Sequence, residues 1–135
     1  EFGKWDLTPA SEQGLQSLVK LLKDNPNITI ELSAHTDMKG DSIFNVNLSE
    51  KRAQSVCNYL IQNGIEAERL TPVGYGKQKP VVADRTLHKQ YPFIPQEQVL
   101  DETFILSLPA DQQEICNQIN RRTEFKVLRT TYKLY

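Results

Sequence analysis

The chain has 135 residues, 39% of them hydrophobic and 24% charged, which predicts one globular domain with a sizeable core. Its 16 basic residues nearly balance 17 acidic ones, and the net charge of −1 argues against a protein that binds nucleic acid or an anionic membrane surface. No stretch approaches the roughly 18 apolar residues of a membrane-spanning helix, and no signal peptide opens the chain. The chain is therefore either cytoplasmic or a mature part of a larger exported protein.

A helix and a strand are predicted in the first third of the chain. Ser11 is a candidate N-cap, and the apolar residues after it recur at the three- and four-residue steps of one helix face: Leu15, Leu18, Val19 and Leu22. The polar, proline-containing residues 25–27 end this helix. Residues 28–34 then alternate apolar and polar with period two, which predicts a strand with one buried face. Residues 35–47 are polar and contain Gly40, which predicts a loop, with a helical turn within it as an alternative.

A second helix is predicted to start near Ser49 and to end at Asn63-Gly64, with an apolar stripe formed by Ala53, Val56, Cys57 and Leu60. Residues 70–75 predict a short strand, and residues 123–128 predict a terminal strand. Between these strands, prolines interrupt residues 81–118, and aromatic side chains favour an ordered loop that packs onto the domain.

These elements predict an α+β two-layer sandwich in which helices cover one face of a small mixed sheet. We assign residues 1–135 to a single domain with an insertion at about 81–118. Cys57 and Cys116 form no CxxC pair, which favours two free, buried thiols. A disulfide between them is the alternative in an oxidising compartment.

Two polar residues near the predicted loop point to a site. Asp37 follows a strand directly, and open sheets bind ligands at the carboxyl ends of strands; alternatively, Asp37 only forms an Asx-turn with its own backbone. Arg52 is expected in the first turn of a helix capped by Ser49, where the helix dipole disfavours a cation by about 0.3–1 kcal/mol. A carboxylate that faces Arg52, from the protein or from a ligand, would explain a cation at this position. Alternatively, Arg52 extends into solvent, or the helix begins earlier.

A third polar feature, Asn120-Arg121-Arg122, precedes the terminal strand. Neighbouring residues of a strand point to opposite sides, so one arginine can reach a site while the other meets water. The alternative is a solvated charge that discourages aggregation at a sheet edge.

These residues fall in five motifs whose order resembles the OmpA-like, or OmpA/MotB C-terminal, family. Each motif alone is weak, but together they extend over nearly the whole chain, from about Leu15 to Leu128. The motifs are Ile30-Glu31-Leu32-Ser33-Ala34-His35-Thr36-Asp37 with Gly40; Asn45, Leu48-Ser49, Arg52-Ala53 and Val56; Gly64-Ile65 with Arg69-Leu70; Val73-Gly74-Tyr75-Gly76 with Pro80; and Asn120-Arg121-Arg122.

The resemblance implies a βαβαββ fold and non-covalent binding of peptidoglycan through the diaminopimelate of its stem peptide. It implies that Asp37 receives the ligand's ammonium and that Arg52, 15 residues later, binds its carboxylate. A zwitterion requires such an anion and cation a few ångströms apart, and a guanidinium binds a carboxylate bidentately. Without ligand, we expect Asp37 and Arg52 to neutralise one another in part.

Four further site residues follow from the same resemblance. Asn45 matches a motif asparagine that lines the pocket, and Thr36 matches a neighbouring contact position. Asn120 and Arg121 match the family's final motif and are carried over as candidate ligand contacts.

The resemblance also implies a partner and a location. We expect a periplasmic domain of a larger protein, which anchors an outer-membrane assembly to peptidoglycan through contacts with its other domains or subunits. The insertion at 81–118 resembles the longer form of the family found in Bacteroidetes. That form includes a component of the type IX secretion system, so a role in protein transport is expected. We expect no nucleic acid partner and no membrane span in this chain.

A cell-wall hydrolase is one alternative, but the residues disfavour it. Only His35 and His88 could act as imidazole bases, and no Ser or Cys stands in a nucleophile motif. A zinc amidase needs several spaced ligands, and His35 and Asp37 lack a third one nearby. We therefore expect no enzyme, no metal and no cofactor, and a hydrogen-bonded structural role for His35.

A protein-interaction domain that keeps the fold but no longer binds peptidoglycan is the second alternative. The presence of both Asp37 and Arg52 argues against it.

Overall fold

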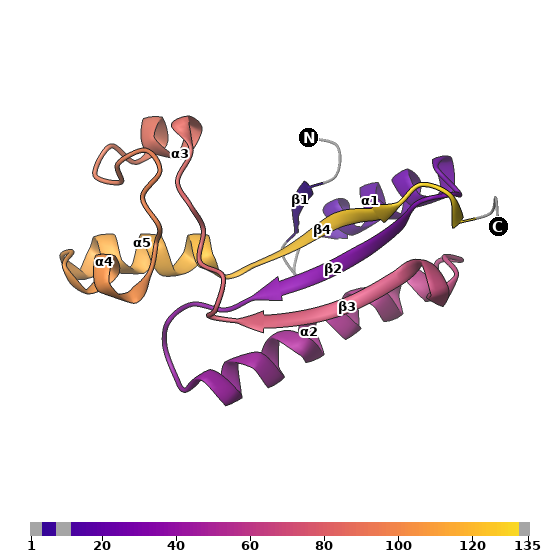
Figure 1. Cartoon of the computed structure of the whole chain (residues 1–135), viewed down its shortest axis with the longest axis horizontal. Coiled ribbons are helices and arrows are strands. Elements are labelled where there is room, and N and C mark those ends of the chain that lie inside the picture. Colours follow the sequence, from indigo (N-terminus) through magenta and orange to yellow (C-terminus); the bar gives the residue numbers. More distant parts are fainter. Residues whose placement is uncertain (1–3, 8–11, 133–135) are drawn as a thin grey trace.

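The computed structural model describes residues 4–7 and 12–132 of the chain (Figure 1). In chain order its elements are β1 (Lys4–Leu7), α1 (Glu12–Asp24), β2 (Thr29–His35), α2 (Ser42–Gln62), the 3-10 helix η1 (Ala67–Arg69), β3 (Leu70–Gly76), α3 (Arg85–Gln90), α4 (Glu102–Leu106), α5 (Ala110–Asn120) and β4 (Arg122–Arg129). The predicted strands and the first two helices are confirmed, and β1 supplies the first strand of the βαβαββ fold that the resemblance implies. Ser11, the expected N-cap of α1, lies outside the described residues.

The strands form one mixed sheet in the order β1-β4-β2-β3. β2 and β3 run parallel, whereas β4 runs antiparallel to both β1 and β2. Helices α1 and α2 pack on the same face of this sheet (Figure 1). The predicted α+β sandwich, with these helices on one face of a mixed sheet, is confirmed.

The main core lies between the sheet and these two helices. The alternation along β2 turns Ile30 and Leu32 toward the helices, and both are fully buried. They meet Leu18 and Leu22 of α1 and Leu60 of α2 in one cluster. Each such side chain contributes roughly 1.5–3 kcal/mol when it is fully buried, so this alternation determines which face of the sheet receives the helices.

A buried cation ties the turn after α1 to the start of β3. Arg69 is only 3% exposed, and its guanidinium donates to the carbonyls of Leu22, Asn25 and Ile28 at 2.8 to 3.0 Å. Burial of a charge is tolerated here because backbone oxygens satisfy its donors. Within the motif Gly64-Ile65 with Arg69-Leu70, Arg69 therefore has a structural role.

Helix α2 begins earlier than the sequence predicts. It starts at Ser42, and the side chain of Asp41 caps it by accepting from the backbone N–H of Phe44 at 3.0 Å. The prediction of a loop over residues 35–47 and of an N-cap at Ser49 was therefore wrong. The physical signal for the true start is Asp41, an ordinary N-cap residue, which the exposed Ile43 and Phe44 after it obscured.

Ser49 instead joins α2 to β3. It is fully buried, its hydroxyl donates to the Val46 carbonyl at 2.9 Å, and it accepts from the Gly76 N–H at 2.9 Å. A Cβ on Gly74 would lie 2.3 Å from the backbone nitrogen of Glu50. The helix therefore lies directly against the strand backbone, a contact that only glycine at position 74 permits.

The insertion is helical rather than a loop, which corrects the prediction for residues 81–118. Helices α3 and α4 start after Asp84 and Asp101, whose side chains accept from the N–H groups of Leu87 and Phe104 at 2.8 and 3.0 Å. Helices this short show no readable apolar periodicity, because five or six residues complete fewer than two turns. The insertion has a small core of its own, formed by Ala83, Ile94, Leu100, Ile105 and Cys116.

Both cysteines are free thiols, and they are buried in different cores. Cys57 belongs to the main core and Cys116 to the insertion core. Burial raises the pKa of the Cys57 thiol to about 11 and also raises the pKa of Cys116. The sequence-based preference for two free thiols agrees with this arrangement.

We predict that Gly74→Ala destabilises the domain, because the added methyl group must displace the backbone of α2. Overpacking of this kind costs about 1–3 kcal/mol or more. Urea unfolding followed by circular dichroism measures the loss. Thr71→Ala, at an exposed position of the same strand, is the control and should leave the unfolding midpoint nearly unchanged. Equal midpoints for wild type and Gly74→Ala would contradict the close packing.

Candidate functional site

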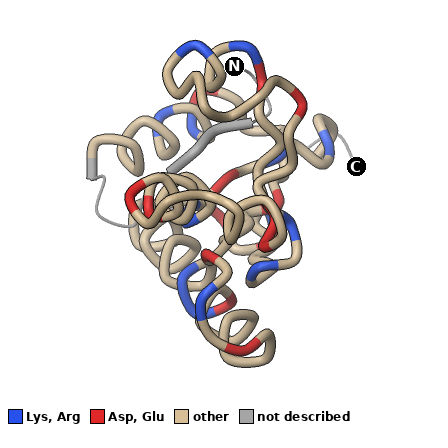
Figure 2. The backbone as a smooth tube through the Cα atoms, turned by 90° about the vertical axis from the view of Figure 1, so that its left-hand side faces the viewer, with Lys and Arg blue, Asp and Glu red and all other residues tan. Residues whose placement is uncertain are grey.

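Several predicted site residues gather at one end of the molecule. The carboxyl ends of β2 and β3, the start of α2 and the helices of the insertion all lie there (Figure 1). Viewed from that end, basic and acidic residues are interspersed along the backbone (Figure 2). The parallel pairing of β2 and β3 brings their carboxyl ends together, as expected for a ligand site in an open sheet.

Asp37 is held in two ways. One carboxylate oxygen accepts from the Lys39 N–H at 2.9 Å, which is an Asx-turn. The other oxygen accepts from the guanidinium of Arg121 in an ion pair. The side chain is 12% exposed. The two sequence interpretations of Asp37, a turn and a charged site residue, are therefore compatible.

Arg121 links Asp37 to the insertion. Its second guanidinium nitrogen donates to Glu114 of α5 at 2.9 Å, and Glu114 also accepts from the ammonium of Lys39 at 3.1 Å. The hydrogen bond to Glu114, followed by that to Asp37, raises the pKa of Arg121. The bonds from Arg121 and then Lys39 lower the pKa of Glu114. Neither Glu114 nor Lys39 was predicted, because no sequence motif relates α5 to the loop after β2.

Arg52 lies in the third turn of α2, so the unfavourable dipole position expected from the sequence does not arise. It lines a cavity of about 210 Å³ together with Arg121, Arg122 and Thr123. Among the described residues, Arg52 makes no hydrogen bond or ion pair. The expectation that Arg52 partly neutralises Asp37 was wrong, because Arg121 takes that place.

Thr36 and Asn45 shape the loop that carries Asp37. The Thr36 N–H donates to the Gly76 carbonyl at 2.9 Å, and its hydroxyl donates to the Asp37 carbonyl at 3.1 Å. The Asn45 amide donates to the Lys39 carbonyl at 2.8 Å from a buried position. These bonds satisfy buried polar groups and hold the loop in one conformation.

Asn120, the last residue of α5, is bonded to the earlier part of the insertion. Its side-chain oxygen accepts from the Val81 N–H at 2.9 Å, and its amide donates to the Leu100 carbonyl at 3.0 Å. It is 3% exposed and also lines the cavity next to Asp37. Asn120 therefore holds the end of α5 against the start and the middle of the insertion.

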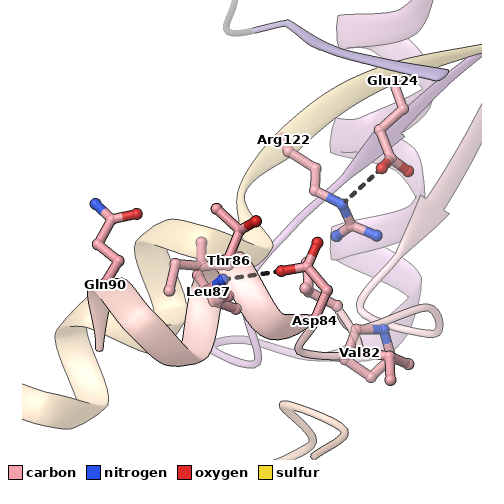
Figure 3. Close-up of a pocket in the computed structure, with 10 residues that line it drawn as sticks. Val82, Asp84, Thr86, Leu87, Gln90, Arg122 and Glu124 are labelled. Atoms are coloured by element: carbon pink, nitrogen blue, oxygen red, sulfur yellow. Dashed lines mark hydrogen bonds and ion pairs between the residues drawn. The ribbon is translucent and has the colours of Figure 1, made fainter. Parts of the chain in front are cut away.

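Arg121 lies between α5 and β4, and Arg122 is the first residue of β4, so the two are not neighbours within a strand as expected. Both arginines line the cavity that contains Arg52, and Arg122 does not extend into water. Its side chain is 11% exposed, and it donates to the carbonyls of Asn120 and Lys79 at 3.0 and 2.9 Å. It lines a cleft of about 520 Å³ with Glu124 and Asp84 (Figure 3). The edge-charge interpretation does not hold for Arg122, because β4 lies inside the sheet.

His35 lies on the sheet face opposite α1 and α2. It is 3% exposed and stacks on Tyr75, with ring centroids 5.3 Å apart. Its Nε2 is 3.3 Å from a Glu124 oxygen, but neither ring nitrogen has a hydrogen-bond partner among the described residues. His35 therefore has the expected structural role, held by burial, by stacking on Tyr75 and by the Glu124 carboxylate next to Nε2.

Nothing in the described part of the chain brings three or more His, Cys, Asp or Glu side chains into a group that could hold a metal ion. Within the same residues, no helix has both the length and the apolar character needed to cross a bilayer.

Comparison with known proteins identifies a family. A model described as the OmpA family matches residues 1–91. Outer membrane protein P5 of Haemophilus influenzae is 36% identical over 80 residues, which cover 59% of this chain and 23% of that protein. The chain thus spans only about a quarter of this curated relative.

Solved structures share the fold. The peptidoglycan-associated lipoprotein from Burkholderia pseudomallei aligns with a TM-score of 0.55 at 22% identity, covering 94% of this chain and 89% of that one. A putative MotB-like protein from Desulfovibrio vulgaris aligns with a TM-score of 0.59 at 22% identity, covering 92% and 65%.

We predict that His35 makes the domain less stable as the pH falls below about 6.5, the ordinary histidine value. Burial lowers the pKa of His35 in the folded chain. Between the two pKa values the unfolded chain therefore binds a proton that the folded chain does not, and stability decreases toward acid by up to about 1.4 kcal/mol per pH unit.

Urea unfolding at pH 7.5 and 5.5 tests this effect in wild type and in His35→Phe, which keeps a ring to stack on Tyr75. The variant should lose less stability between the two pH values than wild type. An equal acid-dependent loss in His35→Phe and wild type would contradict the assignment.

Proposed function

This chain belongs to the OmpA family, and we propose that it binds peptidoglycan non-covalently through the diaminopimelate of the stem peptide. The observation that carries the proposal is a charge arrangement at one end of the sheet. The buried carboxylate of Asp37 is paired with Arg121, and Arg121 also lines the arginine-rich cavity that contains Arg52. An anion and several cations are thus held side by side on a packed scaffold.

This arrangement suits the zwitterionic end of diaminopimelate. The ammonium binds Asp37, whose carboxylate accepts charge-assisted hydrogen bonds, and the carboxylate binds the guanidinium of Arg52. Because Arg121 keeps its bond to Glu114, it can give up Asp37 to the ammonium without losing every partner. It then stands beside Arg52 as a second donor to the ligand's carboxylate.

We further propose that the chain is the wall-binding part of a larger periplasmic protein. Outer membrane protein P5 is named for the outer membrane, and the Burkholderia neighbour is named for its association with peptidoglycan. In this proposal, other domains or subunits of an outer-membrane assembly are anchored through this domain, and a role in protein transport is one setting for it.

The proposal assigns binding without catalysis. The chain's candidate chemistry is a set of fixed charges, and the buried His35 lies on the far face of β2 from the Asp37–Arg121 pair. A protein-interaction domain without wall affinity is the second candidate, because the insertion offers an extra folded surface.

We predict that the purified domain sediments with insoluble diaminopimelate-type peptidoglycan and much less with lysine-type peptidoglycan. Lysine lacks the second carboxylate that Arg52 would bind. The bound fraction is read from gels of pellet and supernatant. Equal retention by both walls would argue against the zwitterion mode, and retention by neither would favour the interaction-domain alternative.

We predict that Asp37→Ala and Arg52→Ala each abolish wall binding while the domain stays folded. Loss of either partner leaves the opposite ligand charge desolvated and unpaired, which costs about 3 kcal/mol and weakens binding more than about a hundredfold. The double variant should bind no worse than either single one, because the two charges act as a unit.

Matched controls remove charges that line none of the cavities described above. Lys51→Ala, one residue from Arg52 on an exposed part of α2, and Asp24→Ala at the end of α1 should sediment like wild type. Circular dichroism spectra establish that all variants are folded. Wild-type sedimentation by a folded Asp37→Ala or Arg52→Ala variant would overturn the site.

A further inference from the structure

A groove leads away from Asp37 along the insertion. A cavity of about 400 Å³ begins at Thr36 and Asp37 and is walled on the other side by Leu100, Asp101 and Glu102 of the insertion. A second cavity of about 190 Å³ lies against the first turns of α2, where Ile43 and Val46 line it. Both cavities are lined by Ser42 and Gln78, so they adjoin one another, and the two together are called the groove.

The insertion creates this groove. Asp101 and Glu102, which wall the groove, come directly after Leu100 in the chain. Leu100 is fully buried in the insertion core. The amide of Asn120 holds the Leu100 carbonyl at 3.0 Å. Met38, next to Asp37, packs against the same core. The wall therefore has a fixed position relative to the Asp37 loop.

The polar lining of the groove is rich in hydrogen-bond acceptors. Asp37, Asp101 and Glu102 bring three carboxylates. Asp37 is paired with Arg121, and one oxygen of Asp101 caps α4, whereas Glu102 has no hydrogen bond or ion pair among the described residues. The single basic side chain in the lining, Lys77, already donates to the Met38 and Gly40 carbonyls at 3.3 and 3.0 Å. Such a lining repels anionic chains and favours an uncharged ligand with many O–H and N–H donors.

The outer end of the groove is apolar and exposed. Ile43 is 76% exposed, and its neighbour Phe44 is 60% exposed. Exposed apolar side chains beside a polar groove suit a ligand with both hydroxyl edges and apolar C–H faces. A pyranose ring has this combination, whereas a charged peptide does not.

We propose that this groove is a saccharide subsite, which holds N-acetylated sugar residues of the glycan strand while Asp37 and Arg52 hold the zwitterion of the attached peptide. The inference rests on the proposed function, since the sugar reaches the groove as part of the same polymer. Carboxylates of Asp101 and Glu102 accept from sugar hydroxyl or acetamido groups, and Ile43 covers a C–H face. The insertion thereby adds specificity for intact wall over free peptide.

The test compares two soluble ligands by isothermal titration calorimetry with the full chain. One is a disaccharide carrying a diaminopimelate tetrapeptide, and the other is the same tetrapeptide without sugar. Wild type should bind the disaccharide-bearing ligand at least about fivefold more tightly, as expected for one or two added hydrogen bonds and contacts.

Two variants locate the effect. Ile43→Ala and Glu102→Gln should each bring the affinity ratio of the two ligands toward one, while the affinity for the free tetrapeptide stays within about twofold of wild type. Ile61→Ala, at an exposed site near the other end of α2, and Asp111→Asn, on the insertion outside the groove, are the matched controls and should keep the wild-type ratio.

The outcomes separate the two proposals. If wild type binds both ligands equally, the saccharide subsite is overturned and the zwitterion site stands. If the variants weaken the free tetrapeptide as much as the disaccharide ligand, the groove holds peptide and the saccharide assignment fails. If wild type binds neither ligand, the proposed function fails, and the subsite fails with it.

Discussion

Helix α2 packs against β3 without intervening side chains, since a Cβ at Gly74 would meet the helix backbone and the Ser49 hydroxyl accepts from the Gly76 N–H. This contact places the early turns of α2 beside the carboxyl ends of β2 and β3. Thr36 is then bonded to Gly76 and Asn45 to Lys39, which fixes the loop between them. The position of Asp37, and with it the proposed site, depends on that close approach.

The charges around Asp37 form a series of ion pairs rather than a single pair. Lys39, Glu114, Arg121 and Asp37 alternate in sign along it. A buried carboxylate without a partner would be costly, and the pairing with Arg121 gives Asp37 a partner and a fixed orientation. Because Glu114 belongs to α5, the insertion takes part in the site and is not a mere addition to the domain surface.

Sequence patterns were reliable where many residues repeat one physical preference. The period-two alternation of residues 28–34 and the stripe along Leu15, Leu18 and Leu22 both place apolar side chains in one core. Sequence patterns were unreliable where a single side chain determines where a helix begins. Asp41, Asp84 and Asp101 each start a helix through a single capping bond, and a lone aspartate is common in loops as well.

The sequence by itself determined the family, the α+β class, the order of the predicted strands and of the first two helices, and the candidate pair Asp37 and Arg52, because periodicity and motif spacing are local properties of the chain. Only the tertiary structure decided that Arg121, rather than Arg52, neutralises Asp37 in the free domain. It also decided that the insertion walls a groove beside Asp37. Such pairings join residues distant in sequence, and they follow from how separate elements pack rather than from any spacing along the chain.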